Sequence, residues 1–191
     1  MRLRRQYCLG ALLAAAALTL GACGGGDGDG DDAMETANGQ RFNQTDVRFV
    51  QKMLPHHMQA LRTAKVAIED GADPRVGTIA REIVEAQKQE IAKMQKMLEQ
   101  FDAPEKPAPA DQQMVWDQNV ADERDADSPQ EVDLVFLTNM IPHHSAAIPM
   151  AQLEIEEGDY GPATTLAEDI KTTQRMEIKE MVTLVRLQKN D

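Results

Sequence analysis

The stretch Met-Leu-Pro-His-His at residues 53–57 recurs 87 positions later as Met-Ile-Pro-His-His at residues 140–144. These two copies contain all four histidines of the 191-residue chain. The match continues without gaps at the same offset, so that residues 46–100 correspond to residues 133–187. A repeat of this length indicates an internal duplication, and each copy is expected to form the same structural unit.

Apolar residues at helical spacing predict two long helices in each copy. The predicted helices cover residues 45–70, 74–101 and 129–157, and a last one begins near Pro162. Ser128-Pro129-Gln130-Glu131 has the form of a capping box before the third helix. The short connections at 71–74 and 158–161 make each pair of helices antiparallel. The sequence therefore predicts an all-α protein, a four-helix bundle built from two duplicated αα-hairpins.

The amino-terminal 22 residues are expected to be a lipoprotein signal peptide. Three arginines precede an apolar run from Leu9 to Leu20 that is too short for a lasting membrane span. The run ends in Leu-Gly-Ala-Cys, which resembles a bacterial lipobox and implies cleavage before Cys23 and attachment of lipid to it. The alternative is an ordinary secretory signal with an incidental cysteine.

Three parts follow the leader. Residues 23–42 begin with a run of glycine and aspartate and are expected to be a flexible tether. The bundle domain is expected at residues 43–190, with repeat one at 46–100 and repeat two at 133–187. A crossover at residues 102–127 connects the repeats, and its only tryptophan, Trp116, is expected to dock on the bundle as a core anchor.

Charge and cysteine usage narrow the functional classes. The formal net charge of −12 becomes −15 once residues 1–22 and their three arginines are removed. A surface this acidic disfavours nucleic acid as a partner. Of the two cysteines, Cys8 lies in the leader and Cys23 is the expected lipid site. A soft metal ligand in the mature chain must therefore be methionine.

A carboxylate in each repeat is predicted to face the bundle core. Glu90 lies within the apolar stripe of its helix, and Glu177 occupies the equivalent position in the second repeat. A buried carboxylate costs several kcal/mol unless it is neutralised, hydrogen-bonded or bound to a cation. Because the histidines flank the stripe of the preceding helix, both glutamates are expected to face all four imidazoles in one cavity.

This combination of side chains predicts a metal site. Imidazole with thioether suits copper, above all the cuprous ion, whereas imidazole with carboxylate suits zinc, iron or the cupric ion. The candidate ligands are His56, His57, His143, His144, Glu90, Glu177, Met53 and Met140, with Met150 as a secondary candidate. The alternative is a buried His–Glu network that sets the helix register and binds no ion, with methionines that only fill the core.

No catalytic function is expected. Di-iron carboxylate bundles need about four carboxylates and Glu-x-x-His pairs, whereas this chain has Gln-x-x-Glu at residues 87–90 and 174–177. No convincing nucleophile is present either. A metal-dependent oxidase or peroxidase remains the enzymatic alternative.

Both repeats share the pattern Asp-x-x-Phe-x-x-x-Met-x-Pro-His-His-x-x-Ala, followed by Gln-x-x-Glu. This pattern resembles the domain-of-unknown-function family 305 and covers nearly all of residues 43–188. The resemblance implies a ferritin-like four-helix bundle, exported, with some members linked to copper binding and tolerance through Met and His. The chain departs from the family at Thr63, where a methionine is common, and in its crossover, which retains only Met114. These departures favour a small site centred on His and Glu.

The expected function is that of a lipid-anchored extracytoplasmic protein that sequesters or transfers a metal ion, with copper favoured over zinc or iron. The expected partners are a membrane, through the lipid on Cys23, and a protein that donates or accepts the metal. The alternative is a cell-envelope interaction module without metal, whose His/Glu core is structural. The choice of inner or outer membrane and the oligomeric state are left open by the sequence.

Overall fold

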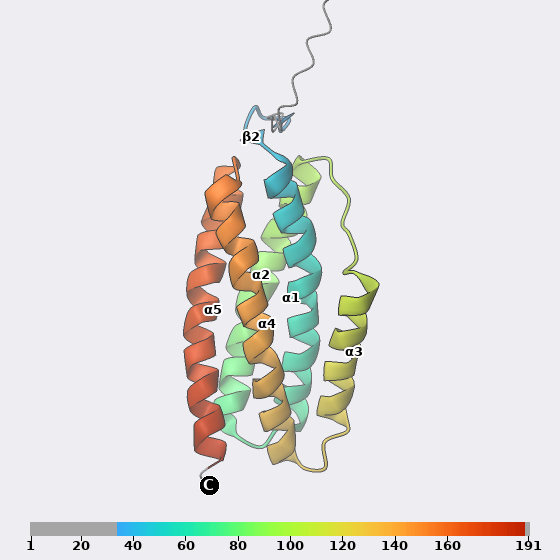
Figure 1. Cartoon of the computed structure of the whole chain (residues 1–191), viewed down its shortest axis with the longest axis vertical. Helices are drawn as coiled ribbons and strands as arrows, with labels where there is room; N and C mark the ends of the chain where they lie inside the picture. The colour runs from blue at the N-terminus through green and yellow to red at the C-terminus, as the bar shows by residue number, and fades with distance from the viewer. Residues whose placement is uncertain (1–33, 190–191) are drawn as a thin grey trace, which may run out of the picture. The chain divides into compact units, whose positions relative to one another are not determined.

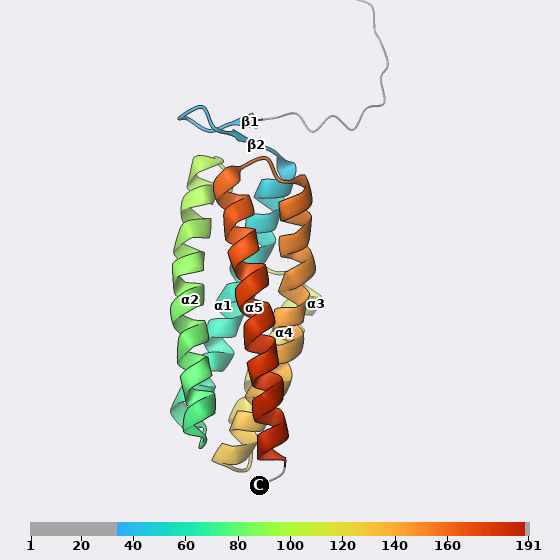
Figure 2. The ribbon, with the colours of Figure 1, turned by 90° about the vertical axis from the view of Figure 1, so that its left-hand side faces the viewer.

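The computed structural model describes residues 34–189. Its helices are α1 (Gln44–Asp70), α2 (Pro74–Gln100), α3 (Ala110–Arg124), α4 (Pro129–Glu157) and α5 (Gly161–Gln188). Helices α1, α2, α4 and α5 form the bundle, and α3 packs alongside α1 and α4 (Figure 1; Figure 2). The predicted all-α class, the two hairpins and their four helices are confirmed. Within the described residues, no helix is both long and apolar enough to cross a membrane.

The crossover contains a helix that the sequence pattern did not predict. Only three residues of α3 are buried, namely Trp116, Val120 and Glu123, so its apolar periodicity is too weak to be recognised from the sequence. Packing against α1 and α4 therefore supports this helix. The side chain of Trp116 is 6% exposed, which confirms that it docks on the bundle.

The last part of the expected tether has structure. Strands β1 (Met34–Glu35) and β2 (Arg41–Phe42) pair antiparallel, and the Phe42 ring stacks on Phe101 with ring centroids 4.5 Å apart. The prediction that the flexible tether extends to residue 42 is therefore wrong, because burial of Phe42 anchors residues 34–42. The predicted leader and the lipid site Cys23 lie outside the described residues.

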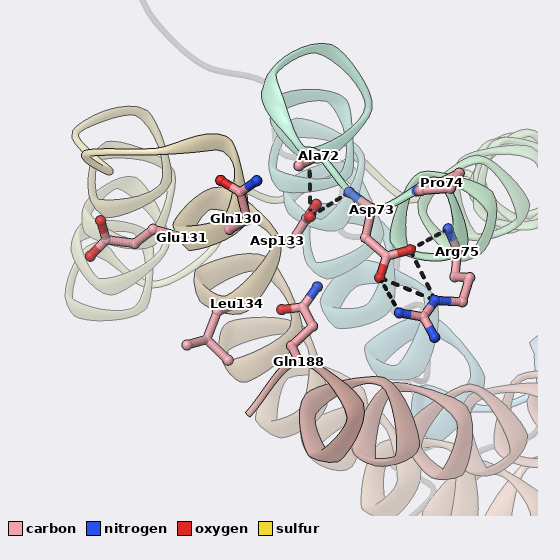
Figure 3. Close-up of a pocket in the computed structure, with 9 residues that line it drawn as sticks. All are labelled: Ala72, Asp73, Pro74, Arg75, Gln130, Glu131, Asp133, Leu134 and Gln188. Atoms are coloured by element: carbon pink, nitrogen blue, oxygen red, sulfur yellow. Dashed lines mark hydrogen bonds and ion pairs between the residues drawn. The ribbon is translucent and has the colours of Figure 1, made fainter. Parts of the chain in front are cut away.

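Two aspartates connect the repeats at opposite ends of the bundle. Asp46 on α1 accepts hydrogen bonds from the backbone N–H of Asp159 and Tyr160, at 3.2 and 2.9 Å, in the turn between α4 and α5. Asp133 on α4 accepts in the same way from Ala72 and Asp73, at 3.0 and 2.7 Å (Figure 3). These positions are equivalent under the 87-residue offset, so the first helix of each repeat holds the hairpin turn of the other. Helices α1 and α4 are consequently antiparallel.

Carboxyl groups close to the two hairpin turns explain two glycines. A Cβ atom on Gly71 would collide with Oδ1 of Asp133, and one on Gly158 would collide with Oε1 of Glu154. Each glycine ends the first helix of its repeat with a backbone N–H that bonds to the carbonyl four residues earlier. These glycines therefore end the two helices and leave room for the carboxyl groups at the turns.

The bundle core is divided into two apolar clusters. One contains Met53 with Ala147 and Ala151, and the other contains the equivalent Met140 with Ala60 and Ala64. On each bundle helix, a short segment with buried polar side chains separates the residues of the two clusters. The candidate site lies in this polar layer.

Candidate metal centre

The polar layer takes two residues from each bundle helix. They are His56 and His57 on α1, Gln87 and Glu90 on α2, His143 and His144 on α4, and Gln174 and Glu177 on α5. The four histidines are between 0% and 8% exposed, and both glutamines are 2% exposed. Local helix geometry accounts for the arrangement, because residues three apart on α2 and α5 lie on one face and adjacent histidines point in different directions.

The second histidine of each motif pairs with the glutamate of its own repeat. Nε2 of His57 lies 2.8 Å from Oε2 of Glu90, and Nε2 of His144 lies 2.7 Å from Oε2 of Glu177. The glutamate side chains are 12% and 13% exposed, so each extends from the edge of the bundle to a fully buried imidazole. Each glutamate therefore faces one histidine of its own repeat, rather than all four imidazoles as expected.

The first histidines of the two motifs meet each other. The ring centroids of His56 and His143 are 3.7 Å apart and their planes are inclined by 32°. Neither ring nitrogen of either residue has a hydrogen-bond partner. The indole of Trp116 lies beside both rings, with centroid distances of 5.8 and 6.1 Å. Helix α3 thus covers the histidine pair.

Burial keeps the imidazoles of His56 and His143, the inner histidines, neutral. The pKa of His56 falls from 6.5 to about 3, mainly because the ring is buried and to a smaller extent because His57 and His144 repel its charged form. Burial, followed by repulsion from His56 and His144, also lowers the pKa of His143 well below 6.5. At neutral pH each ring therefore has an unprotonated nitrogen that can donate a lone pair to a metal ion.

Further polar atoms in the layer lack partners. Nδ1 of His57 and of His144 makes no hydrogen bond, and neither does the side-chain oxygen or nitrogen of Gln87 or Gln174. A buried polar group without a partner costs about 1–3 kcal/mol. The layer therefore has unused capacity to bind a polar or ionic ligand.

Sequence reasoning did not place Gln87, Gln174 or Trp116 among the site residues. The glutamines could have been found, because a polar side chain recurs in both repeats three residues before the glutamate and on the same helix face. Trp116 has no counterpart in a second repeat. Its proximity to the histidines depends on where the crossover packs.

The three methionines predicted as metal ligands do not lie together. Met53 and Met140 are buried, at 0% and 1% exposure, in the apolar clusters on either side of the layer. Met150 lies about 9 Å along α4 from His144 by helical rise. It lines a small pocket with Phe49 and Glu154. The structure therefore does not bring Met150 into the polar layer.

The prediction that one cavity collects all the donor side chains is wrong. Within residues 34–189, no group of three or more His, Cys, Asp and Glu side chains is arranged so that it could hold a metal ion. The reason is that His57 and His144 turn their Nε2 atoms to the glutamates, and only His56 and His143 face each other. The donors that remain together are two imidazoles, with a thioether one turn before each.

A larger cavity, of about 870 Å³, lies at the end of the bundle where the α1–α2 turn meets α4 and α5 (Figure 3). Its lining includes Asp73, Arg75, Glu131 and Asp133, and the guanidinium of Arg75 pairs with Asp73 at 2.6 Å. No histidine lines it. We therefore assign the candidate metal centre to the polar layer.

Comparison with known proteins agrees with this fold. The sequence profile of the family described as Domain of unknown function (DUF305) matches residues 46–185. No curated protein matches the chain. A DUF305 fragment from Deinococcus radiodurans superposes with a TM-score of 0.69 at 28% identity, over 75% of this chain and 96% of that one.

Structures of a protein named CopM are also similar. The Cu(I)-bound form of CopM matches with a TM-score of 0.64 at 29% identity, over 75% of this chain and 97% of that chain. The Cu(II)-bound form matches with a TM-score of 0.66 at 27% identity, over 74% and 95% of the two chains. The present chain is thus similar to a protein that has been crystallised with copper in both oxidation states.

Proposed function

The chain belongs to the DUF305 family, and from this premise we propose that it binds copper ions in the polar layer of its bundle. The observation that carries the proposal is the contact between His56 and His143. Two neutral, buried imidazoles lie ring against ring, and none of their four nitrogens has a hydrogen-bond partner. Such a pair is costly in an apolar core unless another group binds it.

The donor set suits copper better than a harder ion. His56 and His143 would supply imidazole nitrogen, and Met53 and Met140, one helical turn away, would supply thioether sulfur. Imidazole and thioether favour Cu(I), and imidazole alone is compatible with Cu(II). The carboxylates of Glu90 and Glu177 are engaged with His57 and His144, which leaves less oxygen for zinc or iron. The copper-bound forms of CopM support the same choice of metal.

We further propose that copper is cargo rather than a catalytic cofactor. The candidate ligands lie in the core, where a large substrate could not reach them. The protein would sequester the ion, or transfer it to a partner protein, and so contribute to copper tolerance. The Leu-Gly-Ala-Cys sequence at residues 20–23 supports attachment to a membrane through lipid on Cys23, outside the cytoplasm.

A structural role for the layer is the second candidate. The two His–Glu hydrogen bonds are complete without an ion and link the two helices of each hairpin. In that case the protein would be an interaction module of the cell envelope, and the inner histidines would only set the register of α1 against α4.

Metal titration separates the two candidates. We expect the purified chain to bind Cu(I) in competition with a chromophoric Cu(I) chelator, and the variant His56→Ala/His143→Ala to bind at least about tenfold more weakly, a loss of about 1.4 kcal/mol. Circular dichroism must show that the variant remains helical. Equal copper binding by a folded variant, or no binding by the unaltered chain, would refute the proposed site.

A further inference from the structure

A groove of about 460 Å³ runs between α2 and α5 on the side of the bundle formed by these two helices. Its charged lining residues are Glu90 and Lys93 on α2 and Glu168 and Asp169 on α5. Three acidic groups against one lysine give the groove a net negative charge. Such a groove concentrates small cations from solution.

The groove reaches the polar layer through Glu90. This side chain lines the groove, is 12% exposed, and places Oε2 at 2.8 Å from Nε2 of the fully buried His57. The Glu90 carboxylate therefore contacts both the groove and the imidazole of His57.

Buried amides mark the same seam. Gln87 follows the lining residue Ala86 on α2, and Gln174 follows the lining residue Thr173 on α5. Both side chains are 2% exposed, and none of their oxygen or nitrogen atoms has a hydrogen-bond partner. Polar groups without partners therefore lie in the layer, one residue along each helix from the groove lining. This observation is independent of the acidic lining.

We propose that the α2–α5 groove is the entrance for copper ions and that Glu90 is its gate. An ion attracted by the acidic lining would replace His57 as the partner of the Glu90 carboxylate and then pass to the imidazoles. The inference rests on the proposed function, since it names the route to the same site.

A second opening is less suited to a cation. A groove of about 530 Å³ between α1 and the crossover is lined by Pro55 and Met58, which flank the histidines in sequence. Its charged residues are Arg62 and Lys106 against Glu105, and Arg62 pairs with Asp117 at 2.7 Å. This groove therefore lacks the acidic excess that would attract a copper ion to the one between α2 and α5.

The route can be tested by following the rate of copper binding. Trp116 is the only tryptophan of the chain, and its indole centroid lies 5.8 Å from that of His56. Aqueous Cu(II) bound in the layer should quench its fluorescence, so stopped-flow mixing reports association. We expect Glu168→Lys/Asp169→Lys to slow association about tenfold, since a charged cleft alters on-rates by 10-fold or more. The equilibrium affinity should change by less than about twofold, because neither residue lies in the layer.

Two exposed glutamates outside the groove provide a matched control. Glu82 and Glu180 are exposed on the same two helices but do not line the groove. Glu82→Lys/Glu180→Lys changes the net charge by the same amount, and we expect it to leave the association rate within about twofold of the unaltered chain. Equal slowing by both double variants would show that only total charge matters and would overturn the proposed entrance, as would no slowing by either.

Glu90 itself is tested against its counterpart. We expect Glu90→Gln to slow association more than Glu177→Gln, although both variants remove one carboxylate that pairs with a buried histidine. Equal rates for the two variants would refute the gate. If the unaltered chain binds copper at equilibrium but these comparisons fail, only the route is wrong. If it binds none, the proposed function fails first, and the route fails with it.

Discussion

His56 and His143 lie ring against ring, with centroids 3.7 Å apart, although 87 positions separate them in the chain. They are equivalent residues of the two repeats. Because α1 and α4 run antiparallel, equivalent positions can meet only near the midpoint of their contact, and the first histidine of each motif occupies that point. The adjacent His57 and His144 lie about 100° further round their helices and turn to α2 and α5.

The inner and outer histidines should differ in their contribution to the stability of the metal-free protein. His57→Leu leaves the Glu90 carboxylate without its partner, and we expect a loss of about 1–3 kcal/mol in the free energy of unfolding. His56→Leu removes a ring that makes no hydrogen bond, so its effect should be smaller, within about 1.5 kcal/mol. Urea denaturation measures both. The same ranking is expected for His144→Leu and His143→Leu, and a reversed ranking would contradict the assigned contacts.

The inner histidines should weaken the protein in acid. Burial lowers the pKa of His56 to about 3 and that of His143 well below 6.5, so the unfolded chain binds protons at pH values where the folded chain does not. Stability attributable to these residues is present above pH 6.5 and is lost as the pH falls toward 3. Relative to the unaltered chain, His56→Leu/His143→Leu should gain at least about 1.4 kcal/mol per pH unit between pH 6 and 4, which is the contribution of His56 alone. A constant difference across that range would show that both rings titrate normally.

Glu154 should have the opposite dependence. Burial, and then the neighbouring Asp46, raises the pKa of Glu154 from 4.5 to about 9. The folded chain therefore retains a proton that the unfolded chain releases, and stability falls as the pH rises from 4.5 to 9. Glu154→Gln should gain about 1.4 kcal/mol per pH unit over the unaltered chain from pH 6 to 8. The exposed neighbour Glu156→Gln is the control and should show no such trend in thermal unfolding at the same pH values.

The two aspartates at the hairpin turns should both stabilise the fold. Asp46→Ala and Asp133→Ala each remove the acceptor for two backbone N–H groups of the other repeat. We expect each to lower the free energy of unfolding by about 2 kcal/mol or more. The exposed Asp70→Ala, at the end of α1, should change it by less than about 0.5 kcal/mol. If Asp133→Ala were no more destabilising than Asp70→Ala, the link between the repeats would be energetically unimportant.

The spacing of residues within single helices was sufficient to predict most of the fold. The four bundle helices end at Gly71 and Gly158 or at the termini of the repeats, as the sequence predicts. The inward direction of Glu90 and Glu177 was also predictable, since it depends on positions along one helix. Helix α3 was not predictable, because most of its surface is exposed and only Trp116, Val120 and Glu123 are buried.

The sequence by itself determined the duplication, the helices and the helix faces that bear histidine and glutamate, because each of these depends on residue spacing within one element. Only the tertiary structure decided that His57 pairs with Glu90, that His56 meets His143, and that Trp116 covers them. It also placed Met150 outside the polar layer. The physical reason is that neighbouring residues on a helix point about 100° apart, so the way in which separate helices pack decides what each side chain meets.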